Sequence, residues 1–120
     1  MQYMLLIYDD EQVWANFSEA ERGAIFGEYG KLTQELRDSG AYVAGDPLQP
    51  IATATSVRVR DGEPLVTDGP FAETKEQLGG YYVVEAESID EAIEHASKIP
   101  SARYGTIEVR PIMAMEGVPA

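Results

Sequence analysis

The sequence predicts a ferredoxin-like α+β fold, in which an antiparallel sheet carries two helices on one of its faces. The first observation is the order of the predicted elements, strand-helix-strand, then a hairpin, then strand-helix-strand again. The second is the length of 120 residues with 44% hydrophobic residues, which suits one folded domain with a real core. We therefore expect a single domain over residues 1–120.

The first half of the chain is expected to form a strand, a helix and a strand. Residues 2–8 are a nearly continuous apolar run of strand length, and residues 17–40 have helical periodicity. Ser18 and Glu21 have the spacing of a capping box, in which each side chain bonds a free backbone N–H at the helix start. Residues 41–45 follow as a second strand. The apolar face of the helix is expected to comprise Ile25, Tyr29, Leu32 and Leu36.

A hairpin is predicted between the two halves. Residues 55–60 are predicted to be a strand with one polar face, because Val57 and Val59 alternate with Arg58 and Arg60. Asp61 and Gly62 form a strong turn signal, because both positions of a tight hairpin turn favour a positive φ. Residues 64–67 would be the returning strand, and Pro64, which has no N–H to donate, favours a short edge strand.

The second half repeats the pattern of the first. Residues 80–87 are apolar and of strand length, residues 88–100 are helical, and residues 105–112 alternate as a last strand. Ser88 and Glu91 repeat the capping-box spacing. The buried face of this helix is expected to comprise Ile89, Ala92, Ile93 and Ala96. The first strand of each half should lie at the centre of the sheet.

The two central strands are apolar at successive positions, over residues 3–8 and 81–84. A sheet covered on one face only should alternate between apolar and polar residues, so the second face is also expected to be covered. The simplest cover in so short a chain is a second copy, and we predict a homodimer that packs sheet against sheet. A competing interpretation is that the tyrosines line a wet cleft, and both interpretations are compatible.

Charge and composition restrict the partners and the chemistry. The net charge of −12 and the pI near 4.3 argue against direct contact with nucleic acid or an anionic membrane, although high charge also serves solubility alone. The absence of cysteine and the single histidine exclude disulfides, a thiol nucleophile and the usual cysteine- or histidine-rich metal sites, and we expect no cofactor. The start of the chain lacks the features of a signal peptide, no window is long enough for a membrane span, and we expect a cytoplasmic protein. The tail from Met113 has no periodic signal.

Five stretches of the chain together resemble the YCII-related, or DGPF-domain, proteins of bacteria. The stretches are YMLLIY (3–8), AGDPLQP (44–50), VRDG (59–62), VTDGPFAETKEQLGGYYVVE (66–85) and GTIEVRPIM (105–113). The resemblance covers nearly the whole chain, and its middle motif is long and specific. It implies a ferredoxin-like fold that assembles as a dimeric α+β barrel.

The resemblance implies two kinds of role. Some relatives look like small enzymes with a histidine and an aspartate as the active pair, and others occur beside or fused to extracytoplasmic-function sigma factors. This chain departs from the enzyme pattern, because its single histidine, His95, lies in the middle of the second predicted helix. Many relatives carry a histidine before the proline at the end of that helix, where this chain has Lys98, Ile99 and Pro100. This departure argues against carrying the histidine–aspartate pair over to this chain.

The motif Asp68-Gly69-Pro70-Phe71 has two interpretations. As structure it is a turn, in which Asp68 bonds nearby backbone, Gly69 is extended before Pro70, and Phe71 fills the core or the dimer seam. As a site it presents the Asp68 carboxylate at the mouth of a cleft, as an acid/base group or ligand anchor. The structural interpretation is the more economical one.

Other candidate ligand-binding residues lie on either side of this motif. Lys75, within residues 72–77, would belong to a polar rim over the cleft, or to an ordinary solvated loop. Gly79 and Gly80 are expected where another backbone comes close to the chain, and they lack the spacing of a phosphate-binding loop.

Two tyrosines, an arginine and the histidine complete the set of candidates. Tyr8 and Tyr82 would line a cleft or pack in the fold, and Arg110 would bind an anion or form a structural ion pair. His95 lies off the predicted buried face of its helix and is expected to be exposed and inert.

These observations favour a small-molecule-binding homodimer with metal-independent acid/base chemistry, although the sequence leaves open whether it is an enzyme. Asp68 would be the catalytic group, and the ligand-binding residues would be Tyr8, Phe71, Lys75, Tyr82 and Arg110. The rival hypothesis is an accessory protein that regulates an extracytoplasmic-function sigma factor through protein contacts, for which an acidic surface suits a basic partner. A dimer with no ligand is the third possibility.

Overall fold

A computed structural model describes residues 1–115 of the chain. Its elements, in order, are β1 (Gln2–Asp9), α1 (Glu11–Asn16), α2 (Glu19–Asp38), β2 (Tyr42–Pro47), the 3-10 turn η1 (Ile51–Thr53), β3 (Thr55–Arg60), β4 (Glu63–Asp68), β5 (Gln77–Glu85), α3 (Ile89–Ser97), the 3-10 turn η2 (Pro100–Arg103) and β6 (Thr106–Pro111). The expectation of an aperiodic tail extends over residues 116–120, which lie outside the described residues.

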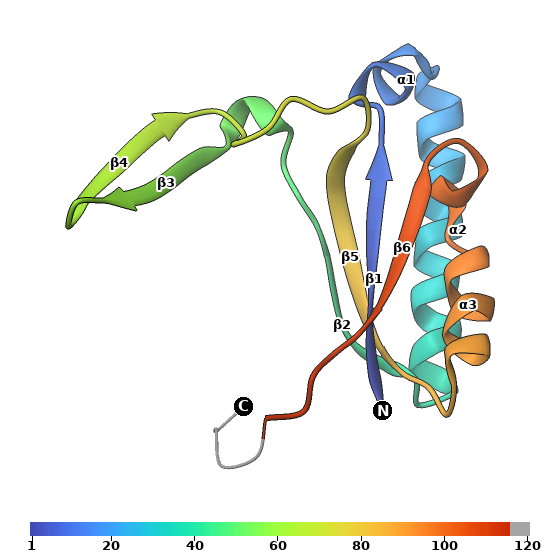
Figure 1. Cartoon of the computed structure of the whole chain (residues 1–120). Helices are drawn as coiled ribbons and strands as arrows, with labels where there is room; N and C mark the ends of the chain where they lie inside the picture. Colours follow the sequence, from blue (N-terminus) through green and yellow to red (C-terminus); the bar gives the residue numbers. More distant parts are fainter. Residues whose placement is uncertain (116–120) are drawn as a thin grey trace.

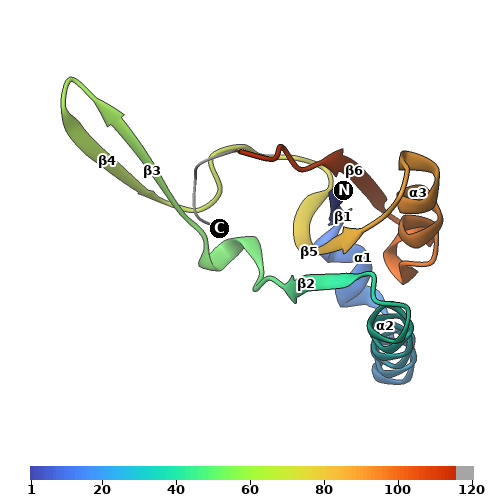
Figure 2. The ribbon, with the colours of Figure 1, turned by 90° about the horizontal axis from the view of Figure 1, so that it is seen from below.

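Four strands form one antiparallel sheet in the order β2-β5-β1-β6. Helices α2 and α3 lie on the same side of this sheet (Figure 2). The fold is therefore α+β, and its strand order is compatible with the ferredoxin-like fold predicted from the two halves. The first strand of each half, β1 and β5, is central as expected.

The core lies between the sheet and the two long helices. Leu5 of β1 and Val84 of β5 are completely buried, and Ile99 after α3 is nearly so. Leu32 and Leu36 bring the predicted apolar face of α2 into the same cluster. Alternate residues of β1 enter this core, so the residues between them face the other side of the sheet.

Helix α2 begins with the predicted capping box, and α3 forms half of the one predicted for it. The Ser18 hydroxyl accepts a hydrogen bond from the N–H of Glu21, and the Glu21 carboxylate accepts one from the N–H of Ser18, a complete capping box. At α3 the Ser88 hydroxyl accepts from the N–H of Glu91, whereas the Glu91 carboxylate accepts from the N–H of Glu87. None of the helices within residues 1–115 has the length and hydrophobicity that a membrane crossing requires.

Helix α3 buries Ala92 and Ala96 as predicted, but Ile89 and Ile93, the other two residues of the predicted face, are exposed. Ala92, Ala96 and Ile99 are buried, whereas Ile89 and Ile93 are 42% and 49% exposed. Both sets of residues have helical spacing, so the periodicity alone fits either face. The small alanine side chains let the helix lie close to the sheet, and this packing turns the isoleucines outward.

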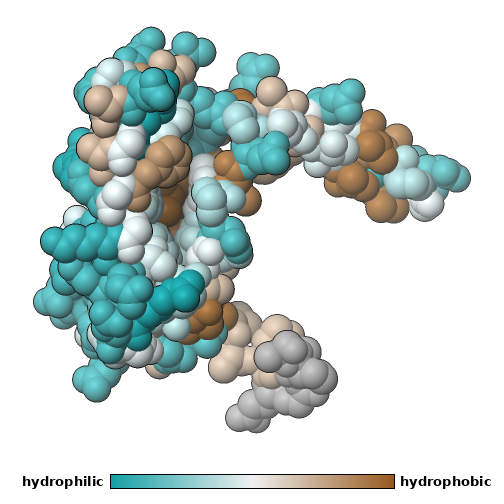
Figure 3. Space-filling view, turned by 180° about the vertical axis from the view of Figure 1, so that it is seen from behind, coloured by the Kyte–Doolittle hydropathy of each residue, from teal (hydrophilic) through white to brown (hydrophobic). Residues whose placement is uncertain are grey.

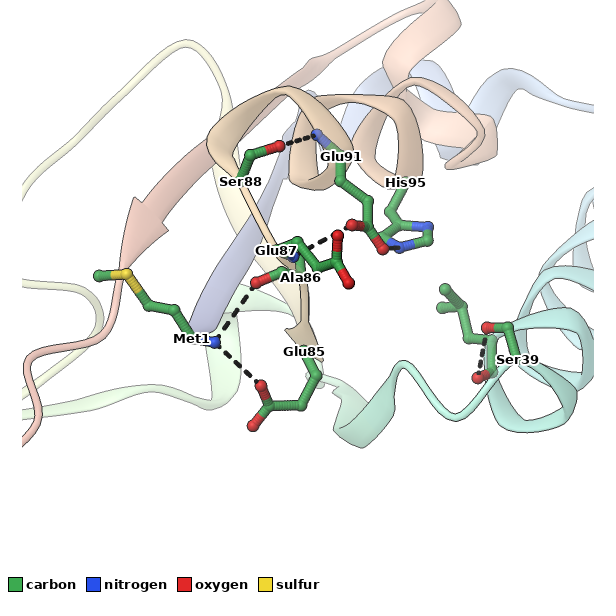
Figure 4. Close-up of polar contacts among 9 residues, drawn as sticks. Met1, Ser39, Glu85, Ala86, Glu87, Ser88, Glu91 and His95 are labelled. Atoms are coloured by element: carbon green, nitrogen blue, oxygen red, sulfur yellow. Dashed lines mark hydrogen bonds and ion pairs between the residues drawn. The ribbon is translucent and has the colours of Figure 1, made fainter.

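His95 lies beside this buried face, which corrects the expectation that it is exposed. Its side chain is only 15% exposed, and its Nε2 atom lies 3.8 Å from a carboxylate oxygen of Glu91 (Figure 4). The Nε2 atom is buried and has no hydrogen-bond partner among the described residues. The reason for the difference is the rotation of α3, which carries position 95 inward together with Ala92 and Ala96.

The predicted hairpin forms and stands away from the rest of the molecule (Figure 1). Strands β3 and β4 pair from Thr55 opposite Asp68 to Arg60 opposite Glu63. Asp61 and Gly62 have φ values of +52° and +77°, as the turn signal predicted. We call residues 55–68 the arm, and the four-stranded sheet with its helices the body.

Helix α1 was not expected from the sequence. Asp10 caps it by accepting a hydrogen bond from the N–H of Gln12 at 2.8 Å. Trp14 of this helix stacks edge to face on Phe17 and Phe26. The short helix therefore closes one end of the space between α2 and the sheet.

Candidate functional site

A cleft of about 810 Å³ lies between α1, α2 and the β2–β5 side of the sheet. We call it the Asp9 cleft, after the carboxylate that lines it. Figure 3 views the molecule from behind, and brown apolar atoms lie deep in the hollow of the body. Aromatic side chains dominate the lining, and they are Trp14, Phe26, Tyr29, Tyr42, Tyr81, Tyr82 and Tyr104.

A carboxylate and three hydroxyl groups meet in this cleft. Tyr29 and Ser101 are hydrogen-bonded at 2.6 Å between their hydroxyl oxygens, and Ser101 and Tyr104 at 3.3 Å. The Asp9 carboxylate lies near the Ser101 hydroxyl, which acts to lower the pKa of that carboxyl. Ser101 is 2% exposed, so the centre of this cluster is shielded from water.

Burial shifts the proton affinity of every titratable member of the cluster. Burial raises the pKa of the Asp9 carboxyl above its ordinary value; the nearby Ser101 hydroxyl opposes this rise, and the nearby Glu11 carboxylate adds to it. Burial likewise raises the pKa of Tyr29 to about 12 and raises the pKa of Tyr104. Asp9 therefore accepts a proton more readily than an exposed carboxylate, while both tyrosines stay protonated and able to donate hydrogen bonds.

Glycines allow close approaches at the cleft, and Gly105 makes the closest one, beside Asp9, the last residue of β1. A Cβ atom on Gly105 would lie 2.2 Å from the carbonyl oxygen of Tyr8 and 2.9 Å from the Cβ of Asp9. A Cβ atom on Gly79 would lie 3.4 Å from an Asp9 carboxylate oxygen, and one on Gly80 3.0 Å from the carbonyl oxygen of Asp46. The prediction of a close backbone approach is confirmed at Gly80, whereas at Gly79 the nearest backbone atom, the carbonyl oxygen of Ile7, would lie at an ordinary contact distance of 4.0 Å.

The α2 wall of the cleft is joined to the sheet by a chain of hydrogen bonds. The Thr33 hydroxyl donates to the carbonyl oxygen of Tyr29 at 2.9 Å, so it accepts from the Tyr82 hydroxyl at 2.7 Å. Further along the wall, the Arg37 guanidinium lies 4.6 Å from the centre of the Tyr42 ring, a cation–π contact. These contacts fix the width of the cleft.

The charges that line the cleft are mainly negative. Glu11 accepts a hydrogen bond from the N–H of Ile51 at 2.9 Å, and Asp46 accepts one from the Tyr81 hydroxyl at 2.8 Å. Arg37 is the cation among the lining residues. Glu11 and Asp46 thus hold the walls together, and Asp9 is the carboxylate that sits with the hydroxyl cluster.

The predicted ligand-binding tyrosines lie on opposite faces of the sheet. Tyr82 pairs with the buried Leu5 and lines the Asp9 cleft, whereas Tyr8 lies on the open face and donates a hydrogen bond to Glu108 at 3.3 Å. Arg110 lies opposite Met4 on that open face. Side chains alternate along a strand, so one chain does not bring Tyr8 and Tyr82 to a common cleft.

Asp68 lies at the base of the arm, as the last residue of β4. The next residue, Gly69, donates its N–H to Ala54 at 2.7 Å, and its carbonyl accepts from the Ser56 hydroxyl at 2.8 Å. Gly69 has a φ of +98° instead of the expected extended conformation, which makes a glycine necessary here. The motif thus closes the base of the arm, in line with its interpretation as a turn.

The remaining predicted residues are also separate from the Asp9 cleft. Asp68 lines a smaller hollow with Glu73 and Thr74, whereas Phe71 is 80% exposed and does not fill the core of its own chain. Lys75 is exposed in the loop that follows. The roles predicted for Asp68, Phe71 and Lys75 in a ligand site stay predictions.

Sequence reasoning missed the residues that form the polar cluster. A signal for Asp9 existed, because it directly follows the apolar strand and so ends a central strand of the sheet. Ser101 and Tyr104 carry no local signal, because they reach Asp9 only through the packing of η2 against β1. The described residues contain no group of three or more His, Cys, Asp and Glu side chains that would hold a metal ion.

Comparison with known proteins adds a family to this geometry. The family model of the YCII-related domain matches residues 1–116 of the chain. An uncharacterized protein of Rhizobium meliloti is 36% identical over 114 residues, which cover 93% of this chain and 92% of that protein. The resemblance predicted from the sequence motifs is confirmed.

Proposed function

This chain belongs to the YCII-related domain family, and we propose that it binds a small, flat, largely apolar molecule in the Asp9 cleft and transfers a proton on it. The observation that carries the proposal is the half-buried Asp9 carboxylate among the hydroxyls of Tyr29, Ser101 and Tyr104. Carboxylates with raised pKa values in apolar clefts are candidates for acid/base groups.

The lining indicates the class of ligand. Seven aromatic residues provide faces for a ring or a planar chain, and the hydroxyl cluster provides hydrogen bonds for one polar end. Asp9, Glu11 and Asp46 repel an anion, which Arg37 alone offsets at the Tyr42 side. We therefore expect a neutral ligand with a carbonyl or hydroxyl group to bind better than a carboxylate of the same shape.

The proton transfer follows from these positions. The Asp9 carboxylate takes a proton from a carbon next to the ligand carbonyl, and the electron pair of that bond moves onto the carbonyl oxygen. Tyr29 or Tyr104, both protonated, donates a hydrogen bond to the resulting enolate oxygen. In a β,γ-unsaturated ketone the enolate is conjugated with the double bond, so return of the proton to its γ carbon gives the α,β-unsaturated isomer with no net gain or loss of atoms or electrons.

The test uses the chain's single tryptophan, Trp14, which lines the cleft. Its fluorescence is followed during titration with 2-naphthol, which is neutral, and with 2-naphthoate, which is the matched anion. We expect saturable quenching by 2-naphthol, at least about tenfold weaker binding of 2-naphthoate, and loss of 2-naphthol binding in Tyr29→Ala. Asp61→Asn, which changes a carboxylate at the tip of the arm, is the control and should bind like the wild type.

Proton transfer is tested separately from binding. Solvent deuterium exchange into a bound naphthyl ketone such as 2-acetonaphthone should be faster with the wild type than with Asp9→Asn. Exchange that is unaffected in Asp9→Asn and lost in Asp68→Ala would overturn the role of Asp9 and favour Asp68, which stays the second candidate for the acid/base group.

We also propose that the protein is a homodimer formed through the open face of the sheet. Met4, Leu6 and Tyr8 of β1 are partly exposed on this face, and no helix of the described chain covers it. Water-exposed apolar residues in a central strand favour a second layer, and a second copy supplies one by symmetry. The predicted dimeric α+β barrel is one such arrangement.

The rival function is regulation of an extracytoplasmic-function sigma factor. The observations in its favour are the net charge of −12 and the apolar side chains exposed on the arm. Calorimetric titration with a purified sigma factor of this group tests it, and saturable heat that Val66→Glu abolishes would support it over the enzyme hypothesis.

A further inference from the structure

The arm has one apolar face and one polar face. Because residues that pair across the hairpin share a face, Val57 and Val66 lie together, and Val59 joins Pro64 beside them. The other face carries Arg58, paired with Leu65, and the pairs Ser56–Thr67 and Arg60–Glu63. Val57, Val59 and Val66 are 62%, 61% and 65% exposed, so the apolar face is uncovered in the single chain.

The arm makes almost no stabilising contacts with the body of its own chain. Every residue of β4 and all of β3 except Ser56 are exposed. A two-stranded hairpin in water is marginally stable at best, because it buries too little apolar surface to offset the ordering of its chain. Yet its base is held in place, since Gly69 donates to Ala54 at 2.7 Å and accepts from Ser56 at 2.8 Å. The hairpin therefore projects from the body and is held only at its base.

The direction of the arm relates it to the open sheet face. In Figure 1 the helices lie on one side of the sheet, and the arm extends from its upper end to the opposite side. Figure 2, turned by 90°, shows the same separation. Figure 3 shows brown atoms gathered toward the outer part of the arm, well away from the body. A second molecule seated on the open face would lie beside the arm.

The exposed surface of the chain is too large for a compact monomer. It amounts to 8453 Å² for a mass of 13.2 kDa. A compact monomer of this mass is expected to expose about 6,400 Å². The excess of about 2,000 Å² exceeds the roughly 800 Å² that each partner buries in an interface of standard size. The arm and the open sheet face are surfaces that such an interface would cover.

We propose that the arm of each chain packs its Val57, Val59, Pro64 and Val66 face on the body of a second copy, so that the two chains of a dimer hold each other by exchanged arms. This inference rests on the homodimer proposed above and adds the element that secures it. In a twofold dimer the contact occurs twice, so each arm is covered and covers its partner. Phe71, which follows the arm in the chain, is a further apolar side chain that is 80% exposed.

The test compares adjacent residues on the two faces of the arm. Val66→Glu places a charge on the apolar face, and Thr67→Glu places the same charge on the polar face of the same strand. A third variant replaces residues 55–68 with a short Gly-Ser linker. A short linker can join the two ends because Ala54 and Gly69 are hydrogen-bonded to each other. Sedimentation velocity over a concentration series gives the dimer dissociation constant, and circular dichroism shows whether each variant folds.

We expect Val66→Glu to raise the dimer dissociation constant at least about tenfold and Thr67→Glu to change it less than about threefold. The linker variant should be folded and dimerise at least as weakly as Val66→Glu. Hydrogen exchange of the arm amides should be slow in the wild-type dimer and fast on dilution to monomer.

Equal effects of Val66→Glu and Thr67→Glu, or a linker variant with the wild-type dissociation constant, would overturn the arm exchange and leave the homodimer standing. A wild type that is monomeric at every concentration would overturn both, and arm amides protected only when a sigma factor is added would assign the arm to a different partner. Binding of 2-naphthol by the same variants reports on the Asp9 cleft independently.

Discussion

The body and the arm of this chain have equally regular strands, yet they differ in what holds them. Leu5 in the centre of the body is completely buried, whereas Val66 in the arm is 65% exposed. Both residues satisfy the local pattern of a strand with an apolar face. The comparison shows that a local sequence pattern is enough to specify a strand. The strand becomes stable only when a second layer of structure covers its apolar face.

The largest expected effect comes from removing the same kind of side chain in the two regions. Leu5→Ala should lower the free energy of unfolding by about 3 kcal/mol, because it leaves a cavity in the core. Val66→Ala, measured where the chain is monomeric, should change it by less than about 0.5 kcal/mol. Urea unfolding followed by circular dichroism measures both, and equal losses would mean that the arm packs on its own body.

A second contrast concerns glycines inside and outside the packed body. Gly105→Ala should lower the free energy of unfolding by about 2 kcal/mol, because the new methyl group meets the Tyr8 carbonyl oxygen beside Asp9. Gly27→Ala, on the exposed side of α2 with open space around it, should raise it by about 0.5–1 kcal/mol. A harmless Gly105→Ala would show that η2 does not press against β1 in solution.

A smaller effect tests whether the buried Asp9 carboxylate lowers the stability of the body. Burial raises the pKa of Asp9 in the folded state, so Asp9 favours folding when protonated and loses that contribution as the pH rises. Asp9→Asn should therefore raise the melting temperature at pH 7 by roughly 2–4 °C. The gain should vanish below about pH 4, where folded and unfolded Asp9 both hold the proton.

The control for this comparison is Asp61→Asn, in which the carboxylate lost is on the exposed turn of the arm. It should leave the melting temperature nearly unchanged from pH 4 to pH 7. A gain in Asp9→Asn that grows as the pH falls would contradict the burial of Asp9.

The smallest effect concerns a polar atom within the body. The Nε2 atom of His95 is buried without a hydrogen-bond partner among the described residues, and such an atom costs about 1–3 kcal/mol of folding free energy when it stays unpaired. His95→Leu should be neutral or stabilise the fold by up to about 1 kcal/mol, as thermal unfolding would measure. A clear loss of stability would show that His95 finds a partner, with Glu91 at 3.8 Å the nearest candidate.

Local signals predicted most of the fold. The capping box at Ser18, the turn at Asp61 and Gly62, and the order of strands and helices all appear as expected. Helix α1 was missed, since its six residues have no apolar periodicity long enough to detect. For α3 the burial of Ala92 and Ala96 was predicted, whereas Ile89 and Ile93 were wrongly assigned to the buried face, because two sets of positions along the helix share helical spacing.

The candidate site was much less accessible to sequence reasoning. Of the six predicted residues, Tyr82 lines the Asp9 cleft, while Tyr8 and Arg110 lie on the opposite face of the sheet. The conspicuous motif around Asp68 drew attention because it is unusual, and what it does in the described chain is to close the arm. Asp9 belongs to no such motif, and it is the last residue of β1, a central strand of the body.

The sequence by itself determined the elements, their caps and turns, and the family, because each depends on residues within a few positions of one another. Only the tertiary structure decided that Asp9 meets Ser101, that His95 turns inward and that the arm stands free. These outcomes depend on which surfaces pack together across the whole chain. Packing is a competition between many contacts of similar strength, and no local pattern ranks them.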